Sequence, residues 1–201
     1  SLSYIQDGMT LMIGSAELHA VPALFLKGLL QKKAKHLTLI VPEIHSPDQE
    51  FIQLLHSGII CRLITSGVHH PTGMEIPNGP LHISLVPHCV LVERIRAGGR
   101  GLGGILTPVG IGTDLEVDKQ IIMVDGRRFL LEKPLFADVA ILFNCVGIPG
   151  KCNECKAYEM NRLLAEASEL VIVYEKPGSC AEMICETLHE RIDYYVKNEA
   201  G

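Results

Sequence analysis

The sequence has no tryptophan and few aromatic residues of any kind, which make up 5% of its 201 residues. Apolar residues still account for 47% of the chain, so its core must be mainly aliphatic. No apolar run reaches the about eighteen residues that a membrane-spanning helix needs. The net charge is −5 and no basic stripe is present, which argues against nucleic acid as a partner. We expect a single domain over residues 1–201, with no membrane contact.

The chain also lacks the motifs that would assign a common cofactor. No Gly-Lys-Ser or Gly-Lys-Thr tripeptide occurs, which excludes a Walker phosphate-binding loop. Gly99, Gly101 and Gly104 match the spacing of the dinucleotide-binding pattern. That pattern has meaning where it leaves a strand, whereas here it follows an expected helix, and Thr107-Pro108 then favours an extended chain. We expect no permanently bound cofactor.

Disulfide and metal frameworks are missing as well. The seven cysteines lack the spacing of a disulfide scaffold, and residues 1–7 contain no basic segment followed by an apolar one. We therefore expect no secretory signal and a cytoplasmic location. Cys152 and Cys155 supply only two of the four ligands that a structural zinc needs, and Cys145 together with a histidine would have to complete the set. We expect reduced thiols at the start of a helix, with a metal or redox role as the alternative.

What the chain does contain is a regular alternation of segments. Short apolar runs predict buried strands at residues 9–13, 37–41, 59–64, 81–86, 139–143 and 170–174. Helical spacing of apolar residues predicts helices at residues 21–33, 48–56, 88–97, 156–168 and 180–197. Asp125-Gly126, between apolar residues 121–124 and 128–131, predicts a hairpin. The alternation predicts an α/β fold with an open, mostly parallel sheet, flanking helices and a small antiparallel hairpin.

The carboxyl ends of the expected strands indicate where a ligand would bind. In an open α/β sheet the cleft lies beyond these ends. The segments that follow the strands, and that therefore are candidates to face a ligand, are residues 15–19, 43–46, 88–89 and 144–150.

The most distinctive stretch of the chain covers residues 93–113 and reads ERIRAGGRGLGGILTPVGIGT. Seven of the 19 glycines fall between positions 98 and 112. Glycine adopts a positive φ at little cost and lets another group approach the backbone closely. We interpret the stretch as a loop that forms one wall of a binding cleft.

This stretch resembles the alpha chain of family I coenzyme A transferases, which reads ERIRAGG and then, after a glycine-bearing spacer, YTPTGVGT. The opening residues 7–14 (DGMTLMIG) and several later apolar segments, with Asn161 between them, also fall in the order of that family. The match covers residues from about 4 to 175. The resemblance implies a three-layer α/β/α fold and an exchange of coenzyme A between an acyl-CoA and a carboxylate.

The resemblance also implies two kinds of subunit. In the family a glutamate in a Ser-Glu-Asn-Gly motif of the beta chain attacks the thioester, which is covalent catalysis. No such motif occurs here, and the nearest tripeptide, residues 77–79 (PNG), lacks the carboxylate. We therefore expect a chain that is inactive alone and needs a beta subunit, in a heterotetramer. The expected substrates are a coenzyme A thioester and acetate, a 3-oxoacid or a short fatty acid.

The alpha chain of the family contributes charge stabilisation. A glutamine in Pro-Gln-Gly, just ahead of ERIRAGG, helps to bind the oxyanion of each tetrahedral intermediate, and His88 of Pro87-His88-Cys89 stands there in this sequence. His88 is thus a candidate oxyanion donor, the alternative being a helix-start residue that faces solvent. Glu93 and Arg94 are expected to pair within the scaffold. The residues expected to shape the acyl site are Gly98, Gly99, Gly101, Gly103, Gly104, Thr107, Pro108, Gly110, Gly112 and Thr113.

Departures from the family pattern leave other functions open. Residues 14–22 keep only the first of the glycines that the family has there, and His88 replaces the glutamine. Both changes favour, as an alternative, a non-catalytic homologue that binds acyl-CoA or a partner protein. A further alternative is a sugar-phosphate isomerase or hydrolase on a related fold, for which Glu17 and Glu43 are the candidate acid/base residues.

Overall fold

The computed structural model describes residues 2–14, 23–32, 34–45, 49–69, 80–143, 156–174 and 193–197. Its largest element is a seven-stranded sheet in which every neighbouring pair of strands is parallel. In chain order its strands are β1 (Thr10–Gly14), β2 (Leu37–Val41), β4 (Ile60–Thr65), β6 (His82–Leu85), β10 (Ala137–Phe143), β11 (Ser168–Tyr174) and β12 (Asp193–Lys197).

The order of the strands is β12-β11-β10-β1-β2-β4-β6, so the first strand of the chain lies at the centre. The chain builds outward from β1 through β2 and β4 to β6, and then crosses to the other side of β1 to add β10, β11 and β12. This is a doubly wound sheet with its switch point between β1 and β10. Because all seven strands are parallel, their carboxyl ends meet at one edge, where such sheets bind ligands.

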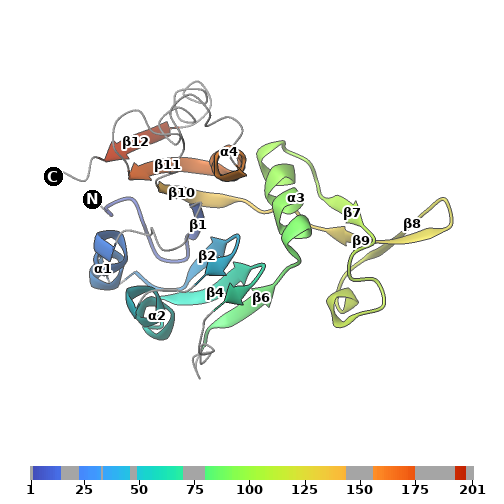
Figure 1. The fold of residues 1–201 in the computed structure, drawn as a ribbon, viewed down its shortest axis with the longest axis horizontal. Helices are drawn as coiled ribbons and strands as arrows, with labels where there is room; N and C mark the ends of the chain where they lie inside the picture. The colour runs from blue at the N-terminus through green and yellow to red at the C-terminus, as the bar shows by residue number, and fades with distance from the viewer. Residues whose placement is uncertain are drawn as a thin grey trace.

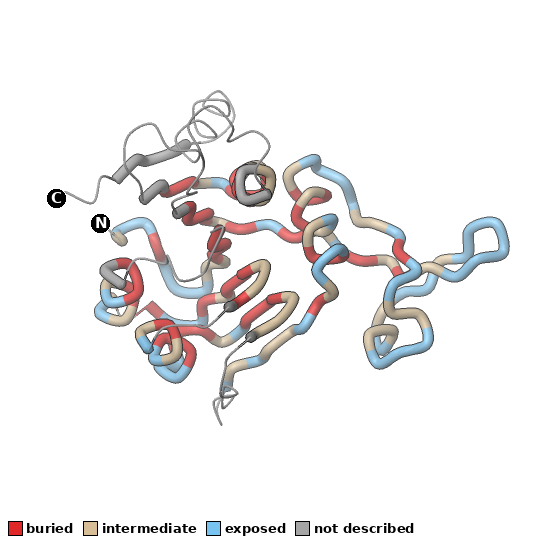
Figure 2. The backbone as a smooth tube through the Cα atoms, viewed as in Figure 1, coloured by how far each residue is buried: buried red, intermediate tan, exposed pale blue. Residues whose placement is uncertain are grey.

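Helices cover both faces of the sheet (Figure 1). The helices α1 (Ala23–Lys32) and α2 (Gln49–His56) pack on one face, over a core that includes Leu11, Leu39 and Leu63. On the other face α3 (His88–Gly99) and α4 (Lys156–Glu166) cover a second core, which includes Met12 and Ile40. Strand residues thus alternate between two cores, and the central strands β1 and β2 are buried along most of their length, whereas no residue of the edge strand β6 is buried (Figure 2).

A smaller antiparallel sheet projects away from the main one (Figure 1). Its strands lie in the order β7 (Ile105–Thr107), β9 (Arg127–Glu132) and β8 (Ile121–Val124), with a 3-10 helix, η2 (Asp114–Glu116), before β8. Asp125 and Gly126, both with positive φ, form the β8–β9 turn. Two further short strands, β3 (Ile44–His45) and β5 (Val68–His69), pair beyond the carboxyl ends of β2 and β4.

The structure confirms the α/β class, the parallel sheet, its six expected strands and the hairpin. Residues 193–197 were wrongly expected to be helical: they form β12, parallel to β11, as their tyrosines and valine favour. The rest of that expected helix lies outside the described residues. Part of the expected glycine loop is also regular, because α3 continues through Gly98 and Gly99 and residues 105–107 form β7.

Candidate functional site

Three loops at the carboxyl edge of the main sheet are tied together. They follow β2, β4 and β6, which are neighbours in the sheet. The Ser66 hydroxyl donates to the carbonyl oxygen of Pro42 at 2.5 Å and lies 3.3 Å from Nδ1 of His88. The structure therefore places His88 at the edge that the sequence indicated, in contact with the loop after β4. The candidate segments after β1 and β10, residues 15–19 and 144–150, lie outside the described residues, and so does Glu17.

His88 is the first residue of α3 and its side chain is exposed. The N-cap residue of α3 is Pro87, and no side chain caps the helix. Peptide N–H groups of the first turn are therefore not taken up by a side-chain cap, and they give this end of the helix a partial positive charge. The imidazole and the helix end together supply hydrogen-bond donors at the carboxyl edge of the sheet.

Gly98 and Gly99 are explained by the packing of α3. A β-carbon at Gly98 would lie 2.0 Å from the backbone carbonyl oxygen of Leu135, and one at Gly99 would lie 2.7 Å from Cβ of Glu166. Neither site has room for a side chain, so this close approach alone requires glycine at both positions. Their expected contact with substrate stays a prediction.

The backbone conformation and close packing explain glycine at positions 101 and 104, but not at position 103. Gly101 has a φ of +66° and Gly104 a φ of +153°, both in the region that favours glycine. A β-carbon at Gly104 would also meet the carbonyl oxygen of Glu132 at 2.7 Å, whereas nothing within the described chain lies within 4 Å of one at Gly103. Gly103 is thus a glycine that neither its own φ nor its neighbours in the described structure demand.

Residues 107–113 form a compact turn that is held by its own hydrogen bonds. The hydroxyl of Thr107 accepts from the backbone N–H of Val109 at 3.2 Å. The hydroxyl of Thr113 donates to the carbonyl of Gly110 at 2.9 Å and accepts from the N–H of Leu115, which caps η2. Pro108 and Gly112 are exposed in the same turn. The turn is therefore preformed and leaves an accessible surface.

A cavity of about 750 Å³ lies between the edge strand β6 and the small sheet. Val86 and Asp114 are among its lining residues, and they stand two residues before His88 and one after Thr113. The candidate residues themselves, His88 and the glycines, threonines and proline of residues 98–113, are not among the residues that line this cavity. Its charged lining residues are Arg62, Arg94, Asp114, Asp118, Lys119, Glu132 and Lys133.

A buried carboxylate fixes the wall of this cavity. Glu132 on β9 is 4% exposed and pairs with Arg94 of α3 at 3.5 Å and with Lys119. Burial lowers the pKa of the Arg94 guanidinium, Glu132 opposes that shift and nearby Arg62 adds to it. Arg94 also donates to the carbonyl oxygen of Lys133 at 2.7 Å. The expectation that Arg94 pairs within the scaffold is confirmed, and these contacts join α3 to the small sheet.

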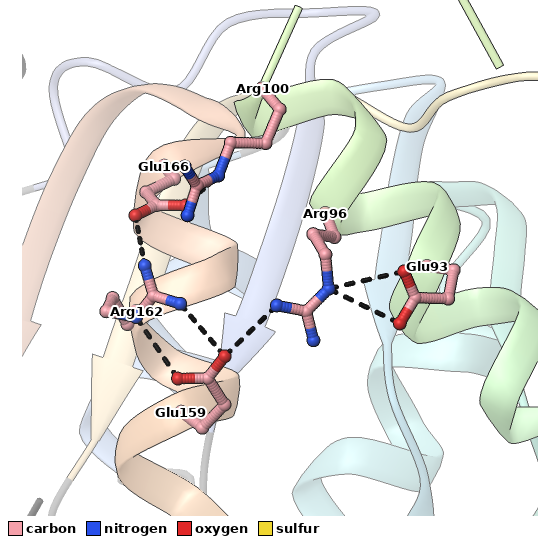
Figure 3. A network of polar contacts seen from close by, with 6 residues as sticks. All are labelled: Glu93, Arg96, Arg100, Glu159, Arg162 and Glu166. Atoms are coloured by element: carbon pink, nitrogen blue, oxygen red, sulfur yellow. Dashed lines mark hydrogen bonds and ion pairs between the residues drawn. The ribbon is translucent and has the colours of Figure 1, made fainter. Parts of the chain in front are cut away.

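Glu93 belongs to a second charged network, which joins α3 to α4 (Figure 3). Arg96 bridges Glu93 on its own helix, at 3.3 Å, and Glu159 on α4, at 3.2 Å. A hydrogen bond from Arg162 is the main cause that lowers the pKa of Glu159. Glu93 thus also pairs within the scaffold. The six members of the network are Glu93, Arg96, Arg100, Glu159, Arg162 and Glu166.

Asn161 is a residue whose place the sequence did not reveal. Its side chain is fully buried on α4, and a β-carbon at Gly14, the last residue of β1, would lie 2.3 Å from its Oδ1 atom. Within the described chain neither amide atom of Asn161 has a hydrogen-bond partner. The amide therefore lies directly against the end of the central strand, at the switch point of the sheet.

Ser66 was also missed, although the rule for parallel strands could have found it. It directly follows β4, whose carboxyl end was not among the segments singled out from the sequence. Glu43, a candidate acid/base residue, does lie at this edge, just after Pro42. Within the described residues no cluster of three or more histidine, cysteine or acidic side chains could hold a metal, and Cys152 and Cys155 lie outside them. None of the helices described there is long and apolar enough to span a membrane.

Comparison with known proteins places this geometry in a family. The family model for coenzyme A transferase matches residues 1–173. The chain is 35% identical over 174 residues to the acetate CoA-transferase subunit alpha of Escherichia coli K12, spanning 85% of this chain and 79% of that protein. It is 40% identical over 142 residues to the alpha subunit of the acetoacetyl-CoA:acetate/butyrate CoA transferase of Clostridium acetobutylicum, spanning 70% of this chain and 65% of that one.

Solved structures share the fold. An acyl-CoA transferase (YdiF) from E. coli O157:H7, solved as a thioester complex with CoA, superimposes with a TM-score of 0.67 at 15% identity. The match covers 97% of this chain and 45% of that one. The decarboxylase AibA/AibB superimposes with a TM-score of 0.66 at 19% identity, so the fold alone does not specify the reaction. The family match and the sequence identities do decide the family, and this chain belongs to the coenzyme A transferases.

Proposed function

We propose that this chain is the alpha-type subunit of a CoA transferase that moves coenzyme A between a short-chain acyl-CoA and a small carboxylate. Acetate, a 3-oxoacid and a short fatty acid are the acceptors that its relatives' names support. The nucleophilic glutamate comes from a separate beta-type chain, since no Ser-Glu-Asn-Gly motif occurs here.

The reaction is an exchange in balanced steps. The glutamate carboxylate attacks the thioester carbonyl and expels the CoA thiolate, which leaves an acyl-glutamyl anhydride. The thiolate attacks the glutamyl carbonyl of that anhydride and releases the first carboxylate, and the acceptor carboxylate reacts with the glutamyl thioester by the same route in reverse. Each attack passes through a tetrahedral oxyanion, and fixed donors aimed at it lower the barrier.

The observation that carries the proposal is the position of His88. It lies at the carboxyl edge of the sheet, 3.3 Å from Ser66, at the start of a helix whose first turn has no side-chain cap. An imidazole and backbone N–H groups at a helix N-terminus are the donors that an oxyanion requires. His88 would thus take the place of the glutamine that the family's alpha chains present.

The turn at residues 107–113 and the glycines before it would shape the acyl site. The hydrogen bonds of Thr107 and Thr113 hold this turn in place without any partner. Gly103 is exposed, and open space surrounds the position of its absent side chain. A bound molecule or a partner chain therefore has room to approach the backbone at Gly103.

The small sheet carries the surface on which we place the beta-type subunit. Eight of the ten large apolar residues that are exposed in the described structure lie between positions 102 and 136, and among them Val117 is 66% and Met123 59% exposed. The projecting hairpin is exposed around its turn and buried at its base (Figure 2). Clustered exposed apolar residues are typical of protein interfaces. We further propose that the pair of chains doubles into a heterotetramer.

Co-expression tests the proposal. The chain is produced with a beta-type chain that carries the Ser-Glu-Asn-Gly motif, purified through a tag on one chain only, and assayed with acetyl-CoA or acetoacetyl-CoA and a panel of short carboxylates. We expect a stable complex, exchange of the acyl group that hydroxylamine quenches, and no exchange by this chain alone. A complex that forms but never exchanges acyl groups would instead support a non-catalytic homologue.

A further inference from the structure

Ser66 holds a defined place between two loops. Its backbone N–H and its hydroxyl both donate to the carbonyl oxygen of Pro42, at 3.0 Å and 2.5 Å. The backbone immediately beyond is also fixed, because Ile44 donates to the carbonyl oxygen of Gly67 at 3.0 Å. The main chain of the loop after β2 therefore sets the direction of the Ser66 hydroxyl, independently of His88.

A serine hydroxyl has one proton, and here Pro42 receives it. Towards Nδ1 of His88, at 3.3 Å, the Ser66 oxygen can act only as an acceptor. The contact therefore requires a proton on Nδ1. The geometry points to Ser66 as a positioning residue that fixes the Nδ1–H tautomer of His88 and thereby decides what the other ring nitrogen, Nε2, can offer.

If His88 has its proposed role, Nε2 of His88 can donate a hydrogen bond to the oxyanion only in one protonation state of the imidazole. In the neutral Nδ1–H tautomer, Nε2 carries a lone pair and no proton, so it cannot donate to an oxyanion. In the imidazolium form both nitrogens carry protons, and Nε2 donates. Within this geometry His88 stabilises the oxyanion only as the imidazolium, whereas the amide of a glutamine would donate at every pH.

Other titratable groups lie on the described segments that meet at this corner. The loop after β2 carries Glu43 and leads to His45 of β3, the loop after β4 leads to His69 of β5, and α3 carries Cys89 beside His88. Nδ1 of His88 contacts the Ser66 oxygen, and we assign the tautomer of His88 to this contact.

NMR on the full chain tests the assignment directly. With ¹⁵N-labelled histidine, long-range ¹H–¹⁵N spectra at a pH where the imidazoles are neutral distinguish a protonated Nδ1 from a protonated Nε2. The His88 signals are identified by their loss in His88→Gln. We expect wild-type His88 to show the Nδ1–H pattern and Ser66→Ala to shift it towards Nε2–H, while Ser66→Thr, which keeps the hydroxyl, restores it.

A matched control comes from β6, where Ser84 Oγ lies 3.3 Å from Nδ1 of His82. Ser84→Ala removes a hydroxyl at the same distance from another imidazole and should leave the His88 signals unchanged. A wild-type His88 with the Nε2–H pattern, or a pattern that Ser66→Ala does not alter, would overturn the inference. These spectra need no beta-type chain, so their outcome is independent of whether the proposed transferase is active.

Kinetics of the assembled complex supply the second readout. If Ser66 fixes the tautomer, kcat of the wild type falls about tenfold per pH unit once the imidazolium is lost. The fall should be shallower in Ser66→Ala, whose neutral imidazole can carry its proton on Nε2, and absent in His88→Gln. Parallel pH profiles for all three enzymes would contradict the inference even if every one of them is active.

Discussion

Replacing Gly98 with alanine separates a packing glycine from one kept for a ligand. In an exposed helix this substitution would stabilise by about 1 kcal/mol, because alanine has the higher helix propensity. Here the new β-carbon would lie 2.0 Å from the Leu135 carbonyl oxygen, which would have to retreat by roughly 1 Å or more to reach van der Waals contact. That carbonyl belongs to backbone and cannot rotate away.

The neighbouring contacts decide the magnitude. Leu135 donates its N–H to the carbonyl of Arg94 at 2.9 Å, and the side chain of Arg94 donates to the carbonyl of Lys133 at 2.7 Å. Moving this segment off α3 strains both hydrogen bonds, each worth about 1 kcal/mol, in addition to an overpacking cost of about 1–3 kcal/mol. After the propensity gain, we expect Gly98→Ala to lower the free energy of unfolding by about 3 kcal/mol.

Urea unfolding followed by far-ultraviolet circular dichroism measures this change in a chain that has no tryptophan. Two glycines of the same stretch serve as controls. Gly103→Ala meets no atom within 4 Å and should change the free energy by less than about 0.5 kcal/mol. Gly101→Ala places a side chain at a φ of +66° in open space and should cost about 1 kcal/mol. A Gly98→Ala variant as stable as Gly103→Ala would refute the packing argument.

Other changes have equally definite outcomes. Glu132→Gln leaves Arg94 half-buried without its charge partner and should lower the free energy of unfolding by about 3 kcal/mol in urea titrations, far more than Glu93→Gln at an exposed pair. The folded-state pKa of Glu159 lies below its ordinary value of 4.5, so its ion pairs stabilise the fold above that pH and this stabilisation is lost on acidification. Glu159→Gln should therefore make the melting temperature fall less steeply below pH 4.5. At pH 7 the substitution should change the free energy of unfolding by under about 1 kcal/mol. Asn161→Leu replaces a buried amide, for which the described chain offers no partner, with a side chain of similar shape, and calorimetry should find stability unchanged or raised; a large loss would reveal a hydrogen bond to the amide. Met123→Asp, at an exposed site of β8, should leave the melting temperature of the chain unchanged and weaken its capture of the beta-type chain, and undiminished capture would move the interface elsewhere.

The main sheet could be predicted from the sequence because its physics is local. Buried parallel strands are short apolar runs on both faces, and residues 37–41 illustrate this with the same bounds in sequence and structure. Residues 193–197 were wrongly included in the helix expected over residues 180–197, and they instead form a strand that pairs with β11, a contact made across the fold.

The candidate site was predictable only in part. The position of His88 followed from the rule that ligands lie at the carboxyl ends of parallel strands, and the structure confirms that position. The packing roles of Gly98 and Gly99 did not follow, because Leu135 and Glu166 approach them from segments distant in the chain. The place of Ser66 directly after β4 could have been found by the same rule, but its contact with His88 depends on the order of β4 and β6 in the sheet.

The proposed catalytic role is tested most directly by isotope exchange in the purified pair of chains. Labelled acetate is incubated with unlabelled acetyl-CoA, and transfer of label into the thioester is measured for the pair, for each chain alone, and for a pair in which the glutamate of the Ser-Glu-Asn-Gly motif of the beta-type chain is replaced by glutamine. If the protein is a two-subunit CoA transferase, we expect exchange by the wild-type pair only. If acetate is not a substrate, another short carboxylate from the acceptor panel takes its place in the assay. Exchange by this chain alone, or none by the pair with any acceptor in the panel, would contradict it.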